Sequence, residues 1–340
     1  MSSVPNANPS CVGPQSEQAG RAAGCQGCPN QGRCSSGELR KPDPALELIR
    51  RRMSSIKHTV MILSGKGGVG KSTVSSQIAF SLASQGFQVG ILDIDICGPS
   101  IPRMMGALHG EVHQSNSGWD PVYVDDNLSV MSIGFLLGDP DDAVIWRGAK
   151  KHALIQQFLS EINWGELDYL IIDTPPGTSD EHISIVNFLR DVGIDGAVIV
   201  TTPQEVALSD VRKEIRFCQR SGIRIIGIIE NMSEVNFEMT ECRYRDYFGN
   251  DITDAVVAKL NEAFPEFAHL IGSICIFPPS NNGGEGLAQW ANVPFLGKIP
   301  IFTSLEKAGE MGQGAPAIGG HVFVVVSKIV NAIVSLVNQS

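Results

Sequence analysis

The chain has 340 residues, 43% of them hydrophobic, so a large folded core is possible and wholesale disorder is excluded. Its 26 Lys and Arg against 36 Asp and Glu give a net charge of −10, which argues against a protein whose main task is to grip nucleic acid. No apolar run approaches the roughly 18 residues that span a bilayer, and no secretory or mitochondrial leader is recognisable. The expected compartment is the cytosol, where thiols stay reduced.

A short cysteine-rich segment, residues 1–40, opens the chain and holds Cys11, Cys25, Cys28 and Cys34. Glycines are frequent between the cysteines and large apolar side chains are nearly absent, so this segment cannot build a core of its own. Glycine turns can bring four thiolates to one point, where a C-x2-C pair and two flanking cysteines complete a four-fold ligand set. The spacing favours an iron–sulfur cluster over a structural zinc ion or an unliganded tail.

The chain changes character after residues 41–56, which read as a polar linker and a short helix. From residue 57 to 340, short apolar runs rich in β-branched residues alternate with helical stretches. The expected strands are 58–63, 88–92, 128–133, 169–172, 196–200 and 223–229, and the expected helices are 71–85, 149–162, 180–189, 205–220, 251–263 and 322–337. The alternation predicts an α/β fold with a mainly parallel, doubly wound sheet that helices cover on both faces.

A phosphate-binding loop follows the first expected strand. Residues 65–72 read GKGGVGKS, which matches G-x-x-x-x-G-K-[ST] between a strand and a helix. Backbone N–H groups of such a loop surround phosphate oxygens, its lysine (Lys71) reaches the β- and γ-phosphates and its serine (Ser72) binds Mg²⁺. The expected nucleotide-binding residues are Gly65, Lys66, Gly67, Gly68, Val69, Gly70, Lys71, Ser72 and Thr73.

Carboxylates at the ends of two other expected strands complete this site. Asp173 follows the strand 169–172 and is expected to hold Mg²⁺. Asp95 belongs to an Asp-x-Asp pair after the second strand and is expected to orient the attacking water or join the metal shell. Lys66 is a second lysine in the loop, which the residues alone leave open between a solvated cation and a catalytic group.

The loop GKGGVGKST at 65–73 resembles the deviant phosphate loop of the MinD/ParA/Mrp class of P-loop ATPases. Further motifs are similar to the Mrp/Nbp branch of cytosolic iron–sulfur cluster assembly ATPases: DIDICGPSIP (93–102), DYLIIDTPPGTSDEH (168–182), TTPQEVAL (201–208), ENMS (230–233) and VPFLGKIP (293–300). With the four cysteines in front, the chain resembles the larger, ferredoxin-extended scaffold subunits of that branch.

This resemblance implies a scaffold that binds [4Fe–4S] clusters and passes them to apo iron–sulfur proteins and downstream transfer factors, driven by slow ATP hydrolysis. It implies a homodimer, or a heterotetramer with a shorter paralogue, without nucleic acid or membrane as partner. Lys66 matches the signature lysine that reaches the partner's nucleotide, where a cation stabilises phosphoryl-transfer charge. Asn231 matches a residue that recognises adenine, and the N-terminal cysteines match a stably bound [4Fe–4S] cluster.

The sequence departs from the family after ENMS, where most members carry a C-P-x-C pair that shares a second cluster between subunits. Residues 235–274 form a variant insert here, and no C-x-x-C follows Cys34. Cys242 and Cys275 could converge as substitute metal ligands, and the alternative is that they are packed or surface thiols. Cys97 and Cys218 are expected to pack.

A second function remains open on the sequence, namely a ParA/MinD-like positioning ATPase that dimerises on ATP and binds DNA or membrane. The cysteine-rich segment, the TPPGTSDEH motif and the acidic balance all favour the cluster scaffold over it.

Overall fold

The structure is a computed structural model that describes residues 6–14, 16–39, 44–95, 98, 100–136, 148–178, 180–189, 192–239, 242–266, 270–279 and 281–339. The chain forms two compact units, residues 1–48 and 49–340, which divide inside helix α2 (Pro44–Met53). Cys97 lies outside the described residues, so its expected packing has no structural counterpart here.

The smaller unit contains a 3-10 turn, η1 (Ala23–Cys25), and a short helix, α1 (Gln31–Ser35). Its chain path is held by hydrogen bonds between segments distant in sequence. The Asn8 side-chain amide donates to the carbonyl oxygens of Gly24 (3.1 Å) and Gln26 (3.2 Å), and the Gln31 amide donates to Gly20 (3.3 Å). These contacts give the cysteine-rich segment a defined fold although it has few apolar side chains.

The larger unit is built on a nine-stranded sheet with the order β10-β9-β8-β1-β7-β2-β6-β5, and β11 also pairs with β9. Its strands are β1 (Ile56–Ser64), β2 (Val89–Asp93), β5 (Val122–Asp125), β6 (Leu128–Ser132), β7 (Leu167–Asp173), β8 (Gly196–Thr201), β9 (Ile225–Glu238), β10 (Ile271–Ile274) and β11 (Phe295–Phe302). Among the described strands of this sheet, only β5 and β10 run antiparallel to their neighbours, which confirms the predicted mainly parallel sheet. A separate hairpin consists of β3 (His113–Ser115) and β4 (Gly118–Asp120).

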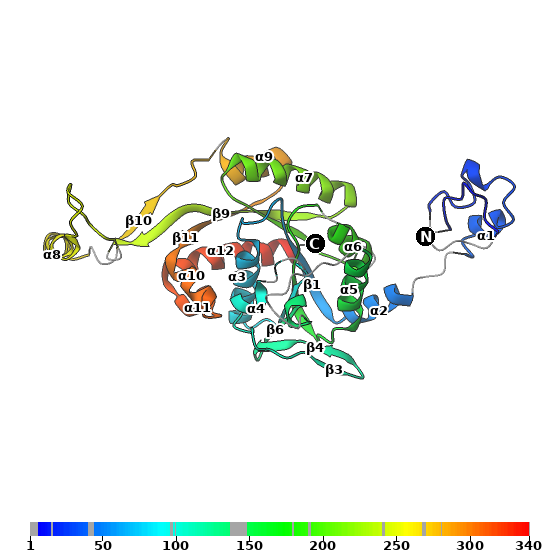
Figure 1. Ribbon diagram of the computed structural model, residues 1–340, viewed down its shortest axis with the longest axis horizontal. Helices are drawn as coiled ribbons and strands as arrows, with labels where there is room; N and C mark the ends of the chain where they lie inside the picture. The colour runs from blue at the N-terminus through cyan, green and yellow to red at the C-terminus, as the bar shows by residue number, and fades with distance from the viewer. Residues whose placement is uncertain are drawn as a thin grey trace. The chain divides into compact units, whose positions relative to one another are not determined.

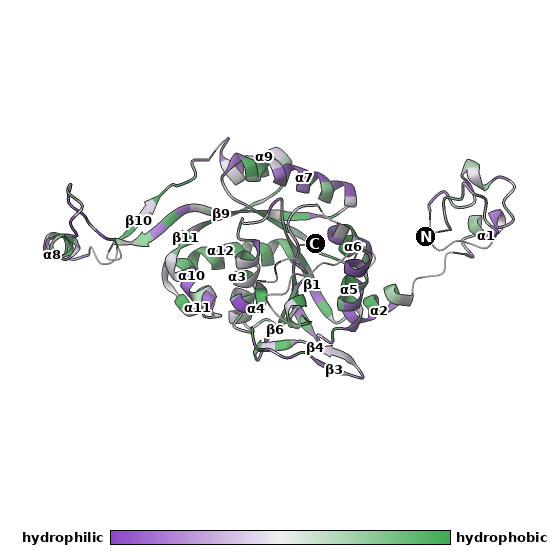
Figure 2. Ribbon diagram, viewed as in Figure 1, coloured by the Kyte–Doolittle hydropathy of each residue, from purple (hydrophilic) through white to green (hydrophobic). Residues whose placement is uncertain are grey.

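Helices cover both faces of this sheet, as the alternating pattern predicts. They are α3 (Lys71–Ser84), α4 (Ile101–Met104), α5 (Gly148–Glu161), α6 (Asp180–Leu189), α7 (Glu205–Ser221), α8 (Thr253–Ala263), α9 (Gly283–Ala291), α10 (Thr303–Glu310), α11 (Ala315–Ile318) and α12 (Gly320–Val337), with a 3-10 turn η2 (Ile133–Leu136). Figure 1 shows α7 and α9 on one side of β9 and α12 on the other. Figure 2 shows that hydrophobic residues concentrate in the strands and in α12.

The central strands are buried on both faces, which explains their continuous apolar sequences. β1 lies between β7 and β8, and its last six residues are all buried. β2 is buried along its whole length. Because the strands are parallel, their carboxyl ends meet at one edge of the sheet, where loops from β1, β2 and β7 come together.

Helix α12 is the one described helix that is long and apolar enough to cross a membrane by length and composition. Its buried residues are Val322, Val326, Ile329, Val330, Ile333 and Val337. Their spacing places them on one stripe of the helix, and they belong to the core cluster that includes strand residues of the sheet. The helix therefore packs as the last core helix on the sheet, as expected for residues 322–337.

The predicted strand 223–229 is too short, because β9 continues through the ENMS motif to Glu238. The last residues of β9, Val235 to Glu238, pair with β10, and α8 lies between β9 and β10 in the chain (Figure 1). We call residues 235–276 the arm. No described residue of α8 is buried, and Tyr247 and Phe248 are 98% and 85% exposed. The variant insert therefore extends the sheet edge.

Candidate nucleotide and metal sites

The phosphate loop leaves β1 and enters α3 with the backbone that the motif requires. Gly70 has a φ of 79° and precedes the first residue of α3, a left-handed conformation that favours glycine. A Cβ at Gly70 would also collide with the Asn231 amide, and one at Gly65 would lie 2.6 Å from the backbone of α7. These glycines let the loop approach α7 and Asn231 closely.

Asp173 at the end of β7 gathers hydrogen-bond donors from α3. Its Oδ1 lies 2.8 Å from Lys71 Nζ and accepts from Ser75 Oγ at 2.6 Å, and its Oδ2 accepts from Ser72 Oγ at 2.7 Å. The Asp173 side chain is fully buried and that of Lys71 is 6% exposed. The structure thus places together the lysine, the serine and the carboxylate expected to bind phosphate and Mg²⁺.

A second buried carboxylate, Asp93, lies beside Asp173, because the ends of β2 and β7 are paired in register. Burial raises the pKa of Asp93, and the neighbouring charge of Asp173 raises it further. Asp93 accepts hydrogen bonds from the Asp95 N–H (3.0 Å) and from Ser132 Oγ (2.9 Å). The first aspartate of the Asp-x-Asp pair therefore fixes the loop that carries the second, a role that the sequence analysis did not assign.

The P-loop and its surroundings enclose a cavity of about 220 Å³. Asp95 and Lys66 both line it, together with loop residues from Gly67 to Thr73. Lys66 has no ion pair among the described residues, and its side chain is half-buried. The expected catalytic residues therefore border the same space as the phosphate loop.

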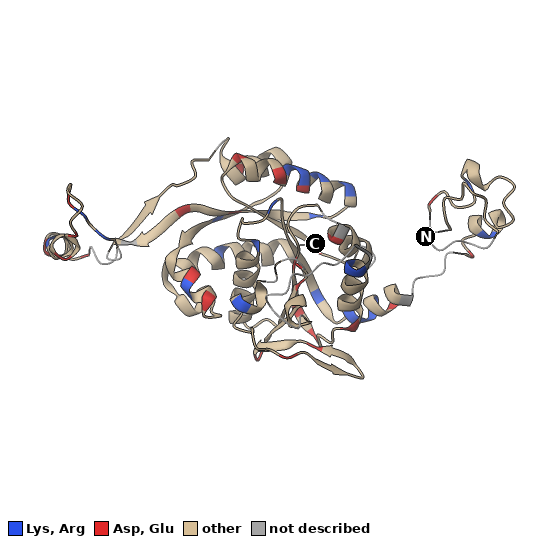
Figure 3. Cartoon of the chain, in the orientation of Figure 1, with Lys and Arg blue, Asp and Glu red and all other residues tan. Residues whose placement is uncertain are grey.

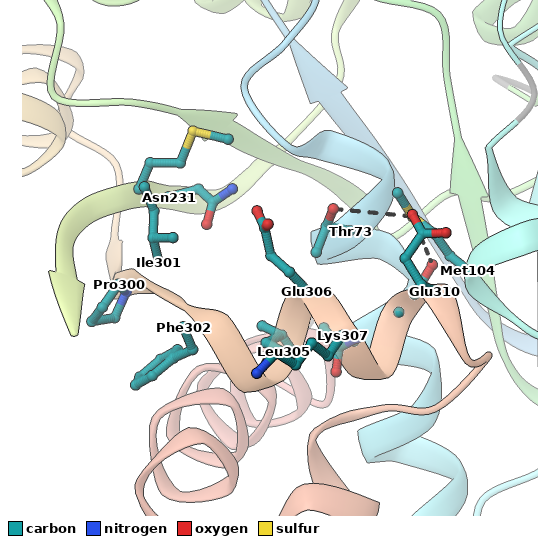
Figure 4. A pocket seen from close by; sticks show the side chains of 14 residues that line it. Thr73, Met104, Asn231, Pro300, Ile301, Phe302, Leu305, Glu306, Lys307 and Glu310 are labelled. Atoms are coloured by element: carbon teal, nitrogen blue, oxygen red, sulfur yellow. Dashed lines mark hydrogen bonds between the residues drawn. The ribbon is translucent and has the colours of Figure 1, made fainter. Parts of the chain in front are cut away.

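A larger cavity of about 440 Å³ shares Thr73 and Met104 with the P-loop cavity. Asn231, Pro300 and Glu306 also line it, and Figure 4 shows the Asn231 and Glu306 side chains pointing into the same space. Asn231 Nδ2 donates to the Val69 carbonyl oxygen at 2.9 Å, which leaves its Oδ1 as an acceptor. The two cavities together offer a phosphate end and a neighbouring end suited to a base and sugar.

Local irregularities of β9 hold Asn231 in place. Met232, the next residue, has a φ of 56°, which is uncommon for a residue with a side chain. The pairing of β9 with β11 shifts register between Ile299 and Ile301. On the other side, the buried Glu230 carboxylate accepts from the Gly284 N–H at the start of α9 (2.5 Å) and lies 3.6 Å from Lys298 Nζ. Bends and bulges of this kind often aim a side chain at a site.

The TPPGTSDEH loop is fastened to the end of β1. Thr174 Oγ1 donates to the Ile62 carbonyl oxygen at 2.8 Å, and His182 Nε2 lies 3.2 Å from Thr174 Oγ1. Burial lowers the pKa of His182 to about 4, so the ring is neutral at physiological pH. This neutral histidine holds the loop next to Asp173.

The N-terminal thiols share one electrostatic environment in the smaller unit. Cys25 and Cys34 are buried, whereas Cys11 and Cys28 are partly exposed. Burial raises the pKa of the Cys34 thiol, and the charges of Cys11, Cys28 and Cys25 raise it further. No three His, Cys, Asp or Glu side chains in the described part of the chain converge closely enough for a single metal ion.

The structure places Cys242 and Cys275 in the arm, at different points. Cys242 is partly exposed, and burial raises the pKa of the Tyr244 hydroxyl, which the neighbouring Cys242 raises further. Cys275 is exposed directly after β10. Their role as ligands of a second cluster stays a prediction. Cys218 is fully buried on α7, which agrees with its expected packing role.

Comparison with known proteins gives a family and a set of structural relatives. The model of a ParA-type family described as NUBPL iron-transfer P-loop NTPase matches residues 55–278. A nucleotide-binding protein from Archaeoglobus fulgidus, solved in complex with ADP, is 34% identical with a TM-score of 0.61, over 82% of this chain and 95% of that chain. The cysteine-rich segment lies outside the residues that the family model matches.

Two MinD cell division ATPases share the fold at lower identity. The protein from Pyrococcus furiosus is 19% identical, over 82% of this chain and 99% of that one. The protein from Aquifex aeolicus is 17% identical, over 82% and 97%. Both give a TM-score of 0.51.

Proposed function

Because the chain belongs to the NUBPL iron-transfer family of ParA-type P-loop NTPases, we propose that it is a [4Fe–4S] cluster assembly scaffold. In this role it binds and hydrolyses ATP and transfers clusters to apo-proteins in the cytosol. The observation that carries the proposal is that one chain holds both a folded N-terminal unit with four free cysteines and, in the larger unit, a P-loop whose Lys71 and Ser72 contact Asp173.

The chemistry of the N-terminal thiols fits a cluster better than a single ion. The C-x2-C pair with two flanking cysteines and no histidine between them resembles ferredoxin-type ligation more than the paired motifs that are usual for structural zinc. A cluster with four irons gives each thiolate its own metal atom, so the sulfurs stand farther apart. When bound, the cluster supplies iron–sulfur chemistry to the scaffold, and Cys11, Cys25, Cys28 and Cys34 hold it.

The protein must deprotonate these thiols before they can act as ligands. Burial and neighbouring thiolates raise the pKa of Cys34, so a proton leaves this thiol when a metal centre binds. Cluster loading therefore releases protons and is expected to strengthen as the pH rises from about 6 to 8.

When a nucleotide binds, Lys71 and Ser72 would give up their contacts with Asp173 for contacts with the ligand. Lys71 would contact the phosphates and Ser72 the Mg²⁺ ion, and Asp173 would help to hold that ion. Asn231 Oδ1 is free to accept a hydrogen bond from the exocyclic amino group of adenine, which supports ATP as the nucleotide. Asp95 orients the attacking water, and Lys66 serves the nucleotide of a second subunit.

A homodimer is the assembly that this proposal requires, and a heterotetramer with a shorter paralogue extends it. The arm supports an interface, since it leaves Tyr247, Phe248, Ile274 and Ile276 exposed. A second cluster held by Cys242 and Cys275 would lie at this surface. Iron would then rise from about eight to about twelve atoms per dimer, and Cys275→Ala would return it to about eight.

The positioning-ATPase alternative has less support. The apolar stripe of α12 is packed in the core, so it does not face a membrane. Figure 3 shows Lys and Arg along α7, which holds Arg212, Lys213, Arg216 and Arg220. Two of these side chains form ion pairs with acidic residues on the same helix, Arg212 with Glu205 (2.8 Å) and Lys213 with Asp210 (2.9 Å). These pairs reduce the positive charge that α7 could offer to DNA phosphates.

The cysteine assignment is tested by variants of the full chain prepared without oxygen. We expect Cys25→Ala and Cys28→Ala to lose about four irons per chain while ATP turnover persists. Cys218→Ala is the control, since that thiol is buried in the larger unit, and it should keep its iron. Unchanged iron in the Cys25 and Cys28 variants would refute the ligand assignment.

A further inference from the structure

Ser75 is a buried hydroxyl that neither the loop motif nor the proposed function uses. It lies one helical turn after Lys71 on α3 and is 0% exposed. Its Oγ is 2.6 Å from Asp173 Oδ1 and 3.1 Å from the Lys71 carbonyl oxygen. A hydroxyl donates one proton, and the short contact to a charged acceptor is the stronger of the two. Ser75 therefore donates to Asp173.

The three donors on Asp173 differ in what happens to them when a nucleotide binds. Lys71 and Ser72 line the P-loop cavity, where the phosphates and Mg²⁺ of a bound nucleotide would be their new partners. Ser75 lines neither of the two cavities around the site. No phosphate or Mg²⁺ bound in these cavities would offer Ser75 a new partner, so we expect its hydrogen bond to Asp173 to remain when a nucleotide binds.

Asp93 lies beside Asp173 on the neighbouring strand, and two charged carboxylates at this distance repel each other. A fixed hydrogen-bond donor on Asp173 therefore helps to hold its carboxylate in one orientation. If Lys71 contacted the phosphates instead, Asp173 would have no cation beside it in the described structure until Mg²⁺ bound. A carboxylate in that state can rotate, and Ser75 is the contact that keeps its Oδ2 aimed at the cavity.

We propose that Ser75 is a positioning residue that fixes the Asp173 carboxylate for Mg²⁺. This inference rests on the proposed nucleotide function and adds a residue outside the loop motif to it. Residues that orient a metal ligand without touching the metal typically change metal affinity by about 10–100-fold when removed. Ser75 is expected to act on Mg²⁺ affinity and to leave metal-free nucleotide binding almost unchanged.

The experiment measures binding of a fluorescent ATP analogue to the full chain, once in EDTA and once across a Mg²⁺ titration. Ser75→Ala should need about 10-fold more Mg²⁺ for half of the Mg²⁺-dependent gain in affinity, with affinity in EDTA within about twofold of wild type. Ser75→Cys, similar in size and a weak donor, should fall between wild type and Ser75→Ala.

Ser81→Ala is the matched control. Ser81 lies on the same helix, is equally buried, and its Oγ has no hydrogen-bond partner among the described residues. We expect this variant to keep the wild-type Mg²⁺ requirement, and thermal unfolding of each variant reports whether it is folded.

Two results would overturn the inference: an unchanged Mg²⁺ requirement in Ser75→Ala, or an equal loss of affinity with and without Mg²⁺. The second would show a general packing defect. A wild-type chain that binds no nucleotide under either condition would overturn the proposed function itself, which this design therefore separates from a failure at Ser75.

Discussion

Glu214 on α7 is a buried carboxyl group with no hydrogen bond to either oxygen in the described structure. Burial raises its pKa from 4.5 to about 7. The unfolded chain therefore loses this proton near pH 4.5, whereas the folded chain keeps it until about pH 7. The stability that this group contributes is present below pH 4.5 and is lost as the pH rises to 7.

Glu214→Gln should stabilise the larger unit at pH 8 and not at pH 4. A shift of this size corresponds to about 3 kcal/mol of unfolding free energy. The measurement is unfolding by denaturant at both values of pH, with the exposed Glu262→Gln as control. Equal stabilisation at pH 4 and pH 8 would contradict the proposed titration.

Lys66 provides a second prediction at the scale of one residue. Its ammonium group lines the P-loop cavity without an ion pair among the described residues. If it serves the nucleotide of a partner subunit, Lys66→Ala should slow hydrolysis by about 1,000-fold or more and change ATP affinity little. Turnover and affinity measured side by side decide this, and equal loss of both would show a contact within one subunit.

At the scale of elements, α12 tests whether the apolar C-terminal stretch is a core helix. Ile333 is buried at 1% exposure, whereas Val324 is 46% exposed on the same helix. Ile333→Ala should cost about 2–4 kcal/mol of unfolding free energy, and Val324→Ala less than about 0.5 kcal/mol. Denaturant unfolding measures both, and similar costs at the two positions would argue against the packed arrangement.

Strongly patterned elements were predictable from the sequence, and those that depend on distant contacts were not. β9 was predicted to end at 229, although Val235 and Phe237 alternate with polar residues in the way of a further strand. Helix α9 carries Gly283, Gly284 and Gly286, which disfavour a helix by propensity. The Glu230 carboxylate on β9 accepts a hydrogen bond from the Gly284 N–H in the first turn of α9, a contact between distant residues that no local pattern reveals.

The site shows the same division. The loop motif located Lys71 and Ser72, and strand ends located Asp173 and Asp95. Ser75 and Asp173 are 98 positions apart, so their contact could not be predicted from the sequence. The one local signal for Ser75 is its position four residues after Lys71. That spacing of four puts Ser75 and Lys71 on the same face of α3.

On the scale of the whole molecule, the proposal joins a thiol unit and an NTPase unit, each with its own internal contacts. Lys71→Ala removes the only lysine paired with Asp173 in the described structure and should abolish ATP binding. Its iron content should match wild type, because the described contacts of Lys71 and Asp173 all lie within the larger unit. Loss of iron in this variant would show that the two sites depend on each other.

The most direct test of the scaffold proposal is the metal content of the wild-type chain prepared without oxygen. Iron, acid-labile sulfide and zinc are quantified together, with electron paramagnetic resonance after reduction. We predict about four irons and four sulfides per chain from the N-terminal thiols, and no stoichiometric zinc. Zinc in place of iron, or no metal at all, would contradict the proposal.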